Sequence, residues 1–168
     1  MTLEIPATAA LWFLPFALPL CLWVAWSDMR DMRIPNRAVL ALLAVFVVIG
    51  PLTLPLSVFG WQLLHLAVVL VVGMGLNAAG LLGAGDAKFA AAAAPFVALG
   101  DVRFLIALFA ATLLAAFLTH RLAGRSPLRR LAPSWQSWTR RTEFPMGLAL
   151  GPALAIYLAL GASWGSAG

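Results

Sequence analysis

Charged residues and cysteines are scarce in this sequence. Charged residues make up 10% of the 168 residues and hydrophobic residues 63%, whereas a soluble domain carries about 25% charged residues. This composition excludes an ordinary soluble domain and favours a membrane protein with several spans. The single cysteine, Cys21, excludes an internal disulfide and a cysteine-based zinc site. The net charge of +5 does not indicate a nucleic-acid partner, because the apolar runs point to a lipid environment.

Histidines are also few, since His65 and His120 are the two that the sequence contains. We expect His65 to be buried or at the membrane interface, and His120, beside Arg121 at the end of an apolar run, to face water. Histidine and cysteine are the usual ligands of zinc. With so few of them, we predict no metal site and no cofactor.

Six apolar runs approach the length of about 20 residues that a helix needs to cross a bilayer. The sequence therefore predicts an all-α polytopic membrane protein, a bundle of about six transmembrane helices in a single domain over residues 1–168. The fourth run is short, and we expect it to lie inside the bundle or to start below the membrane surface. The runs are residues 7–26, 38–58, 61–82, 87–99, 102–119 and 144–160.

The basic residues predict the orientation of the chain. Of the 11 lysines and arginines, all except Arg103 lie in the loops that follow the first, third and fifth runs. Loops rich in lysine and arginine remain in the cytoplasm. We therefore expect these three loops to be cytoplasmic and both termini to lie on the other side of the membrane.

The longest basic loop, residues 120–143, contains LRRLAPSWQSWTRR. Leu131, Trp135 and Trp138 are spaced so that a helix would place them on one face, which predicts a short helix lying in the membrane interface. Arg141 belongs to the same basic segment. The alternative is that the loop is a basic tether without a role in substrate binding.

The sequence contains six acids, and two of them stand at the ends of apolar runs. Asp28 closes the first run, where it could also be a solvated acid paired with Arg30 or another arginine. Asp86 follows Gly83-Ala84-Gly85 and opens the fourth run, where it could also serve as a helix N-cap. We expect three other acids to be surface residues: Asp31 among arginines, and Glu4 and Asp101 in solvated loops outside the cytoplasm. Glu143 should lie on the cytoplasmic side.

Asp28 and Asp86 are more informative as a pair. Two membrane crossings separate them, so both should lie at the cytoplasmic end of the bundle. If the first and fourth spans are neighbours, the carboxylates can meet and share a proton. One can then activate a water while the other acts as an acid toward a carbonyl. This is the chemistry of aspartic proteases, and it needs no metal.

Three motifs in this order resemble the prepilin peptidases, polytopic aspartic proteases of the GxGD class. They are Asp28 followed after six residues by Pro35-Asn36, then the segment from Gly83 to Lys88, and finally FPMGLALG at residues 144–151. The resemblance implies that Asp28 and Asp86 are catalytic, that Gly83 and Gly85 shape the active-site loop, that Pro35 and Asn36 form a turn and cap, and that Lys88 occupies a basic position that is typical after GxGD.

The resemblance also implies a function. Such enzymes remove a short basic leader from prepilin or pseudopilin precursors at the cytoplasmic face of the bacterial inner membrane. Larger members carry paired cysteines in an N-terminal region and methylate the new N-terminus. Because Cys21 is the sole cysteine, we expect no methyltransferase activity. The short form resembles the peptidases of tight-adherence (Tad/Flp) pili, and archaeal preflagellin peptidases are related.

Two other functions remain open on the residues alone. Acids within membrane spans also serve ion- or proton-coupled transporters, although a transporter predicts acids deep in the bilayer. An inactive scaffold protein would not need Asp28 or Asp86 at all. Cleavage of a precursor distinguishes the peptidase from both alternatives.

Overall fold

The computed structural model describes residues 2–140 and 143–167, and within them it is all-α apart from one small pair of strands. The predicted helical membrane fold is confirmed, because five of its helices are long and apolar enough to cross a membrane. The α-helices are α1 (Ala7–Asp31), α2 (Asn36–Thr53), α3 (Leu56–Ala78), α4 (Ala84–Ala93), α5 (Val102–Arg125) and α6 (Gly147–Trp164). The shorter elements are β1 (Leu3–Pro6), η1 (Ala94–Phe96), η2 (Leu99–Asp101), η3 (Pro127–Leu131), η4 (Gln136–Trp138) and β2 (Gly165–Ser166).

Helix ends differ from the predicted runs by several residues. α1 continues to Asp31 and ends where Met32 adopts the left-handed conformation with φ 52°, its N–H bonded to the carbonyl of Asp28. α2 ends earlier than predicted, because Leu54 is extended and Pro55 becomes the N-cap of α3. A residue before proline is biased toward extended conformations, which explains why the break falls here.

α4 corresponds to the short fourth apolar run, and it lies inside the bundle as predicted. Its buried residues include Ala87 and Phe89, and α2, α3 and α6 all pack against it. Ten residues of helix rise only about 15 Å, so α4 alone cannot cross a bilayer. The turns η1 and η2 carry the chain on to Asp101, beside the two termini.

Asp101 corrects one prediction from the sequence, because it is a buried residue and not a solvated one. Only 4% of its surface is exposed. Its carboxylate accepts the N–H groups of Glu4 at 2.9 Å and Ile5 at 3.0 Å, and the hydroxyl of Tyr157 at 2.7 Å. Unpaired N–H groups are costly in an apolar setting. The carboxylate of Asp101 therefore supplies hydrogen-bond acceptors for two backbone N–H groups of β1. β1 pairs in parallel with β2 near the C-terminus.

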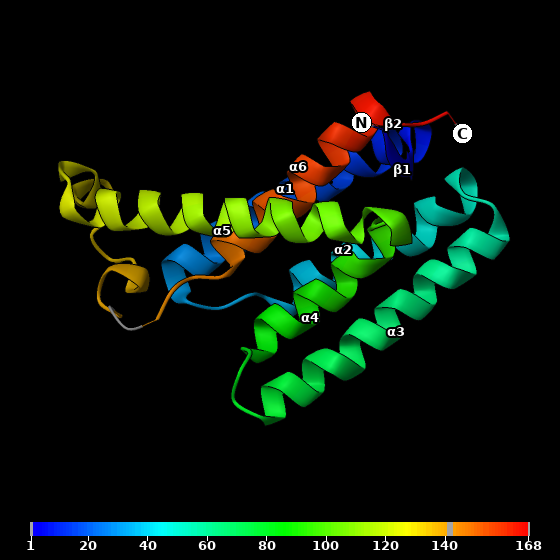
Figure 1. Cartoon of the computed structure of the whole chain (residues 1–168). Helices are drawn as coiled ribbons and strands as arrows, with labels where there is room; N and C mark the ends of the chain where they lie inside the picture. The colour runs from blue at the N-terminus through cyan, green and yellow to red at the C-terminus, as the bar shows by residue number, and fades with distance from the viewer. Residues whose placement is uncertain (1, 141–142, 168) are drawn as a thin grey trace.

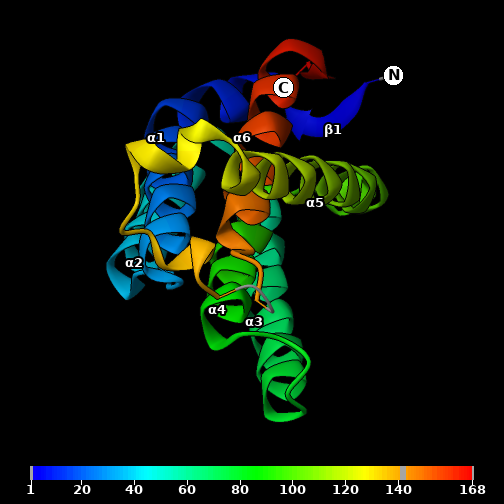
Figure 2. The ribbon, with the colours of Figure 1, turned by 90° about the vertical axis from the view of Figure 1, so that its left-hand side faces the viewer.

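α1 and α6 form the centre of the bundle, and they lie side by side in both views (Figures 1 and 2). Small residues on α6 allow the close approach: a Cβ atom at Gly151 would lie 2.5 Å from the carbonyl oxygen of Cys21. α5 runs obliquely to the other helices in Figure 1 and packs mainly on α6. α3 projects beyond its neighbours at the end where α4 begins (Figure 2).

After α5 ends at Arg125, the described part of the basic loop contains no further α-helix, so the predicted helix carrying Leu131, Trp135 and Trp138 on one face is wrong. Two short turns, η3 and η4, replace it, and prolines start or interrupt the segment. Trp138 is buried and does not face lipid: its indole N–H donates to the carbonyl of Ala132 at 2.9 Å, and its ring stacks on His120. The predicted exposure of His120 is therefore also wrong. Arg141 lies outside the described residues.

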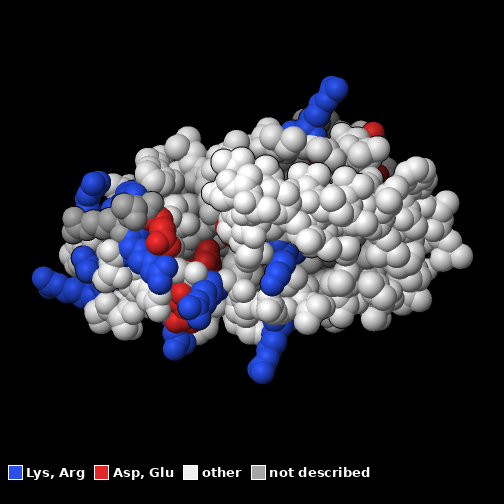
Figure 3. Space-filling model, turned by 90° about the horizontal axis from the view of Figure 1, so that it is seen from below, with Lys and Arg blue, Asp and Glu red and all other residues white. Residues whose placement is uncertain are grey.

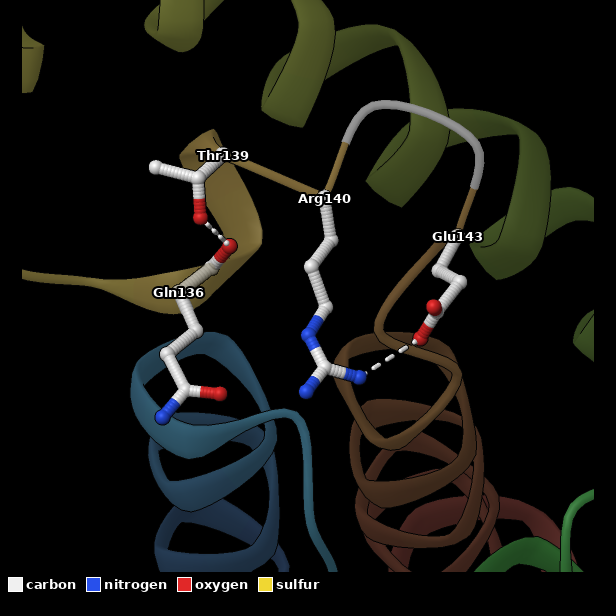
Figure 4. Close-up of polar contacts among 4 residues, drawn as sticks. All are labelled: Gln136, Thr139, Arg140 and Glu143. Carbon is white, nitrogen blue, oxygen red and sulfur yellow. Dashed lines mark hydrogen bonds and ion pairs between the residues drawn. The ribbon is translucent and has the colours of Figure 1, made fainter.

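The C-terminal part of this loop is tied by local polar contacts. The hydroxyl of Thr139 donates to the carbonyl of Gln136 at 2.8 Å, and Arg140 forms an ion pair with Glu143 at 3.1 Å (Figure 4). η4 packs against α1. The loop consequently lies close to the end of α1 that carries Asp28.

Candidate active site

Asp28 lies in the last turn of α1 and is 6% exposed. Its Oδ2 atom accepts the backbone N–H of Gly147, the first residue of α6, at 2.7 Å. Arg30 pairs instead with Asp31 at 3.6 Å, where both side chains are about half exposed. The interpretation of Asp28 as a solvated acid paired with an arginine is therefore wrong, whereas Asp31 is the surface residue that was predicted.

Asp86 lies in the first turn of α4 and is half-buried. Gly83 is the N-cap residue, and no side chain forms a capping hydrogen bond there. The alternative interpretation of Asp86 as the N-cap is therefore wrong. Burial, together with the nearby charge of Asp28, raises the pKa of Asp86 to about 6.

The two carboxylates are near enough to influence each other electrostatically, although their helices hardly touch. Asp28 acts electrostatically on Asp86, yet the bundle is not held by direct packing of α1 on α4. Instead, α2 and α6 each pack against both helices. This arrangement brings the C-terminal end of α1 and the N-terminal end of α4 to the same end of the molecule.

Gly83 and Gly85 leave room that a side chain would fill. A Cβ atom at Gly83 would lie 2.6 Å from Oδ2 of Asp86, and one at Gly85 would lie 3.3 Å from Cβ of Ile34. The φ angle of Gly83 is an ordinary −65°. Glycine is therefore favoured at position 83 because a side chain there would crowd the Asp86 carboxylate. The backbone conformation does not require glycine.

Pro35, Asn36 and Lys88 form the neighbouring part of the site. Pro35 is the N-cap residue of α2, and its carbonyl accepts the N–H of Ala38 at 3.0 Å. The Nζ atom of Lys88 donates to Oδ1 of Asn36 at 3.3 Å. Lys88 thus connects the start of α2 with α4, so that the two motifs that stand far apart in the sequence are in contact.

Gly147 is a site residue that the sequence analysis did not single out. Besides the hydrogen bond from its N–H, the lack of a side chain matters: a Cβ atom would lie 2.9 Å from Cβ of Asp28, 3.1 Å from Oδ2 of Asp28 and 3.2 Å from Cγ1 of Val24. The signal that could have found it is the FPMG segment at the start of the last helix.

The site offers acid–base chemistry. Asp86 retains its proton to a higher pH than an ordinary aspartate, while the N–H of Gly147 is aimed at the other carboxylate. Such a pair can hold one acid and one base at the same time. In residues 2–140 and 143–167, no cluster of three or more His, Cys, Asp or Glu side chains is arranged to hold a metal ion.

The chain matches a known protein family. A model of the type IV leader peptidase family matches residues 15–120, a segment that includes Asp28, Pro35, Asn36, Asp86 and Lys88 but ends before Gly147. No curated protein and no solved structure matches the chain. Because the matched segment covers more than half of the sequence, the chain belongs to the type IV leader peptidase family.

Proposed function

We propose that this leader peptidase is an aspartic endopeptidase that uses Asp28 and Asp86 to remove the short basic leader of prepilin-like precursors. The observation that supports this most is that Asp28, at the end of α1, helps to raise the pKa of Asp86, at the start of α4, so the two carboxylates act on each other at one end of the bundle. A pair of coupled acids is the arrangement that hydrolysis of a peptide bond without a metal requires.

The two acids take different roles in this mechanism. Asp28, with the Gly147 N–H bonded to its Oδ2 atom, is the base that accepts a proton from the attacking water. Asp86 holds the proton and donates it toward the oxygen of the scissile carbonyl, consistent with its raised pKa. Gly83 and Gly85 keep space for the carboxylate and the substrate backbone, while Lys88 and Asn36 position the start of α4 against α2.

The precursor would place its apolar helix in the lipid beside the bundle. An apolar cavity of about 460 Å³ opens between α3, α4, α5 and α6, and it is lined by residues that include Phe89, His65 and Leu154. Phe89 follows Asp86 by about one helical turn. A helix lying against this cavity would hold the leader junction close to the two carboxylates.

The charge distribution supports a cytoplasmic active site. Lys, Arg, Asp and Glu side chains gather toward one end of the face in Figure 3, and the opposite end of that face is almost entirely uncharged. With the positive-inside rule, we propose that this end faces the cytoplasm of a bacterial inner membrane and that both termini lie outside. We further propose a Tad/Flp-type client and no methyltransferase activity.

Sealed membrane vesicles test the activity, its side and its product together. A precursor with a basic leader and an apolar helix is added to inverted vesicles and to right-side-out vesicles that contain the chain. We expect cleavage in the inverted vesicles, with the cut between leader and helix and an unmethylated new N-terminus even when a methyl donor is present. Mass spectrometry of the products measures whether cleavage occurs, where the cut lies and whether the new N-terminus is methylated.

The control is a set of vesicles without the chain. Cleavage confined to right-side-out vesicles would reverse the proposed orientation, and a methylated product would contradict the absence of methyl transfer. If several precursors with different leaders all remain intact, the peptidase proposal fails and a transporter or scaffold becomes the better explanation.

The pH dependence of cleavage tests the proposed acid. Because the pKa of Asp86 is raised to about 6, its proton is present below that pH and is lost as the pH rises through it. We therefore expect kcat/KM, which reports the free enzyme, to fall over this range. The Asp31→Asn variant should show the same profile, and a rate that stays constant or increases would show that Asp86 is not the acid.

A further inference from the structure

A second cavity lies at the end of α5, apart from the two catalytic aspartates. Its volume is about 160 Å³, many times the ~15 Å³ that one water molecule needs. Arg121, Arg125 and Arg129 line it, together with His120 and Ser137. Among the residues that the structure describes, no acidic side chain lines this basic cavity.

Polar groups at the basic cavity are buried without partners. Both ring nitrogens of His120 and the hydroxyl oxygen of Ser137 have no hydrogen-bond partner among the residues that the structure describes. His120 is 7% exposed and Ser137 only 2%. Buried polar groups are nearly always hydrogen-bonded. Two such side chains at one cavity therefore indicate a ligand that supplies the missing bonds.

The walls of the basic cavity are held in place by packing. The ring of Trp138 stacks on His120 with centroids 4.9 Å apart, and its indole N–H is anchored on Ala132. Gly124 lets the indole approach α5, since a Cβ atom there would lie 3.3 Å from the Trp138 ring. The cavity is thus formed before any ligand binds, which limits the ordering cost of binding.

The charges of the cavity select an anion. Three arginines and two further hydrogen-bond donors suit a phosphate group, because arginine bonds to phosphate with two parallel N–H groups. The precursor's basic leader is excluded as the ligand, since the cavity would repel it. Arg121 and Arg125 stand in the last part of a helix long enough to span the membrane, where lipid headgroups lie.

We infer that the basic cavity at the end of α5 binds a phosphate group, carried by an anionic phospholipid of the same leaflet or by a soluble phosphate ester. His120 and Ser137 contribute hydrogen bonds, and the arginines contribute charge. Because η4, which carries Ser137, packs against α1, the bound group would also hold the loop beside the helix that carries Asp28.

Native mass spectrometry of the full-length protein in detergent, titrated with phosphatidylglycerol, tests this inference. We expect one saturable equivalent to bind to the wild type. Arg125→Gln/Arg129→Gln should bind about tenfold or more weakly, because two of the three arginines that line the cavity lose the charge and the paired N–H groups that bond to phosphate. Ser137→Ala, which leaves the charge unchanged, should bind several-fold more weakly. Titrations with glycerophosphate and with inorganic phosphate distinguish a lipid from a soluble ligand.

The matched control is Arg33→Gln/Arg37→Gln, which removes the same charge from exposed positions that do not line the basic cavity. It should lose less than about threefold in affinity, since it acts only through the general surface field. Competition by glycerophosphate would identify a soluble phosphate as the ligand, and its failure to compete would identify the lipid. Equal losses in both double variants, or uptake without a saturable first equivalent, would overturn the inference.

Discussion

Replacing Asp28 or Asp86 with asparagine is expected to reduce leader cleavage by at least roughly 10⁴-fold in kcat, as is usual when one member of a catalytic group is removed. Asparagine has nearly the shape of aspartate but can neither accept the proton of the attacking water nor donate one to the carbonyl. Each acid should be essential by itself, because the proposed mechanism needs a base and an acid together. The measurement is single-turnover cleavage of a precursor in membranes.

Protein stability should not explain this loss. The raised pKa of Asp86 means that the folded protein binds the proton more tightly than the unfolded chain. The stability that this provides is present at low pH and declines as the pH rises through the folded-state value. A neutral asparagine at position 86 removes this decline, so Asp86→Asn should be at least as stable as the wild type at neutral pH.

Asp31→Asn is the matched control for both substitutions. Asp31 lies on α1 near Asp28, but its side chain is about half exposed and pairs with Arg30. We expect its cleavage rate to remain within about twofold of the wild type, since exposed ion pairs contribute little. If Asp86→Asn cleaves at the wild-type rate, Asp86 is a structural acid at the start of α4 and the proposed mechanism is wrong.

Replacing Gly147 with alanine is expected to have the second-largest effect, a loss of about 10²-fold in kcat. The added Cβ atom would lie 2.9 Å from Cβ of Asp28, so α1 or the carboxylate must move, and the 2.7 Å hydrogen bond to Oδ2 would be lengthened or lost. A displacement of about 1 Å in an active site can cost this much in rate. Gly147 is therefore a positioning residue: it acts by holding the Asp28 carboxylate and does not itself touch the substrate.

The control for this substitution is Gly75→Ala on α3, where a Cβ atom would meet nothing within 4 Å. It should retain the wild-type rate and, because alanine favours helix, the wild-type melting temperature. In Gly147→Ala we expect kcat to fall while KM for the precursor changes little, since the site of the apolar helix is intact. A loss confined to KM or to protein abundance would contradict the positioning role.

The helices were predictable because each depends on a local property. A run of apolar residues long enough to cross a bilayer predicts a span whatever lies next to it. The shortness of α4 followed in the same way from the length of its run. The ends of the helices were less predictable, since α1 ends at Met32 in a left-handed conformation that is uncommon for its residue type, and α2 ends at Leu54 in an extended conformation.

The polar residues whose exposure was wrongly predicted, Asp101 and His120, both contact residues that are distant in the sequence. Asp101 is buried because it accepts hydrogen bonds from Glu4 and Ile5 near the N-terminus and from Tyr157 on α6. The packing of Trp138 on His120 likewise replaces the interfacial helix that its spacing predicted. The residue pattern within one segment does not show which distant segment will pack against that segment and bury its side chains.

Composition and apolar length determined by themselves that this chain is a helical membrane protein, and its two acidic motifs determined which residues to examine. Only the tertiary structure decided that Asp28 and Asp86 interact, because α2 and α6 pack between their helices. It also decided that Gly147 holds Asp28. Local sequence sets how long and how apolar each helix is, whereas side-chain volumes at the contacts between helices set which ends meet.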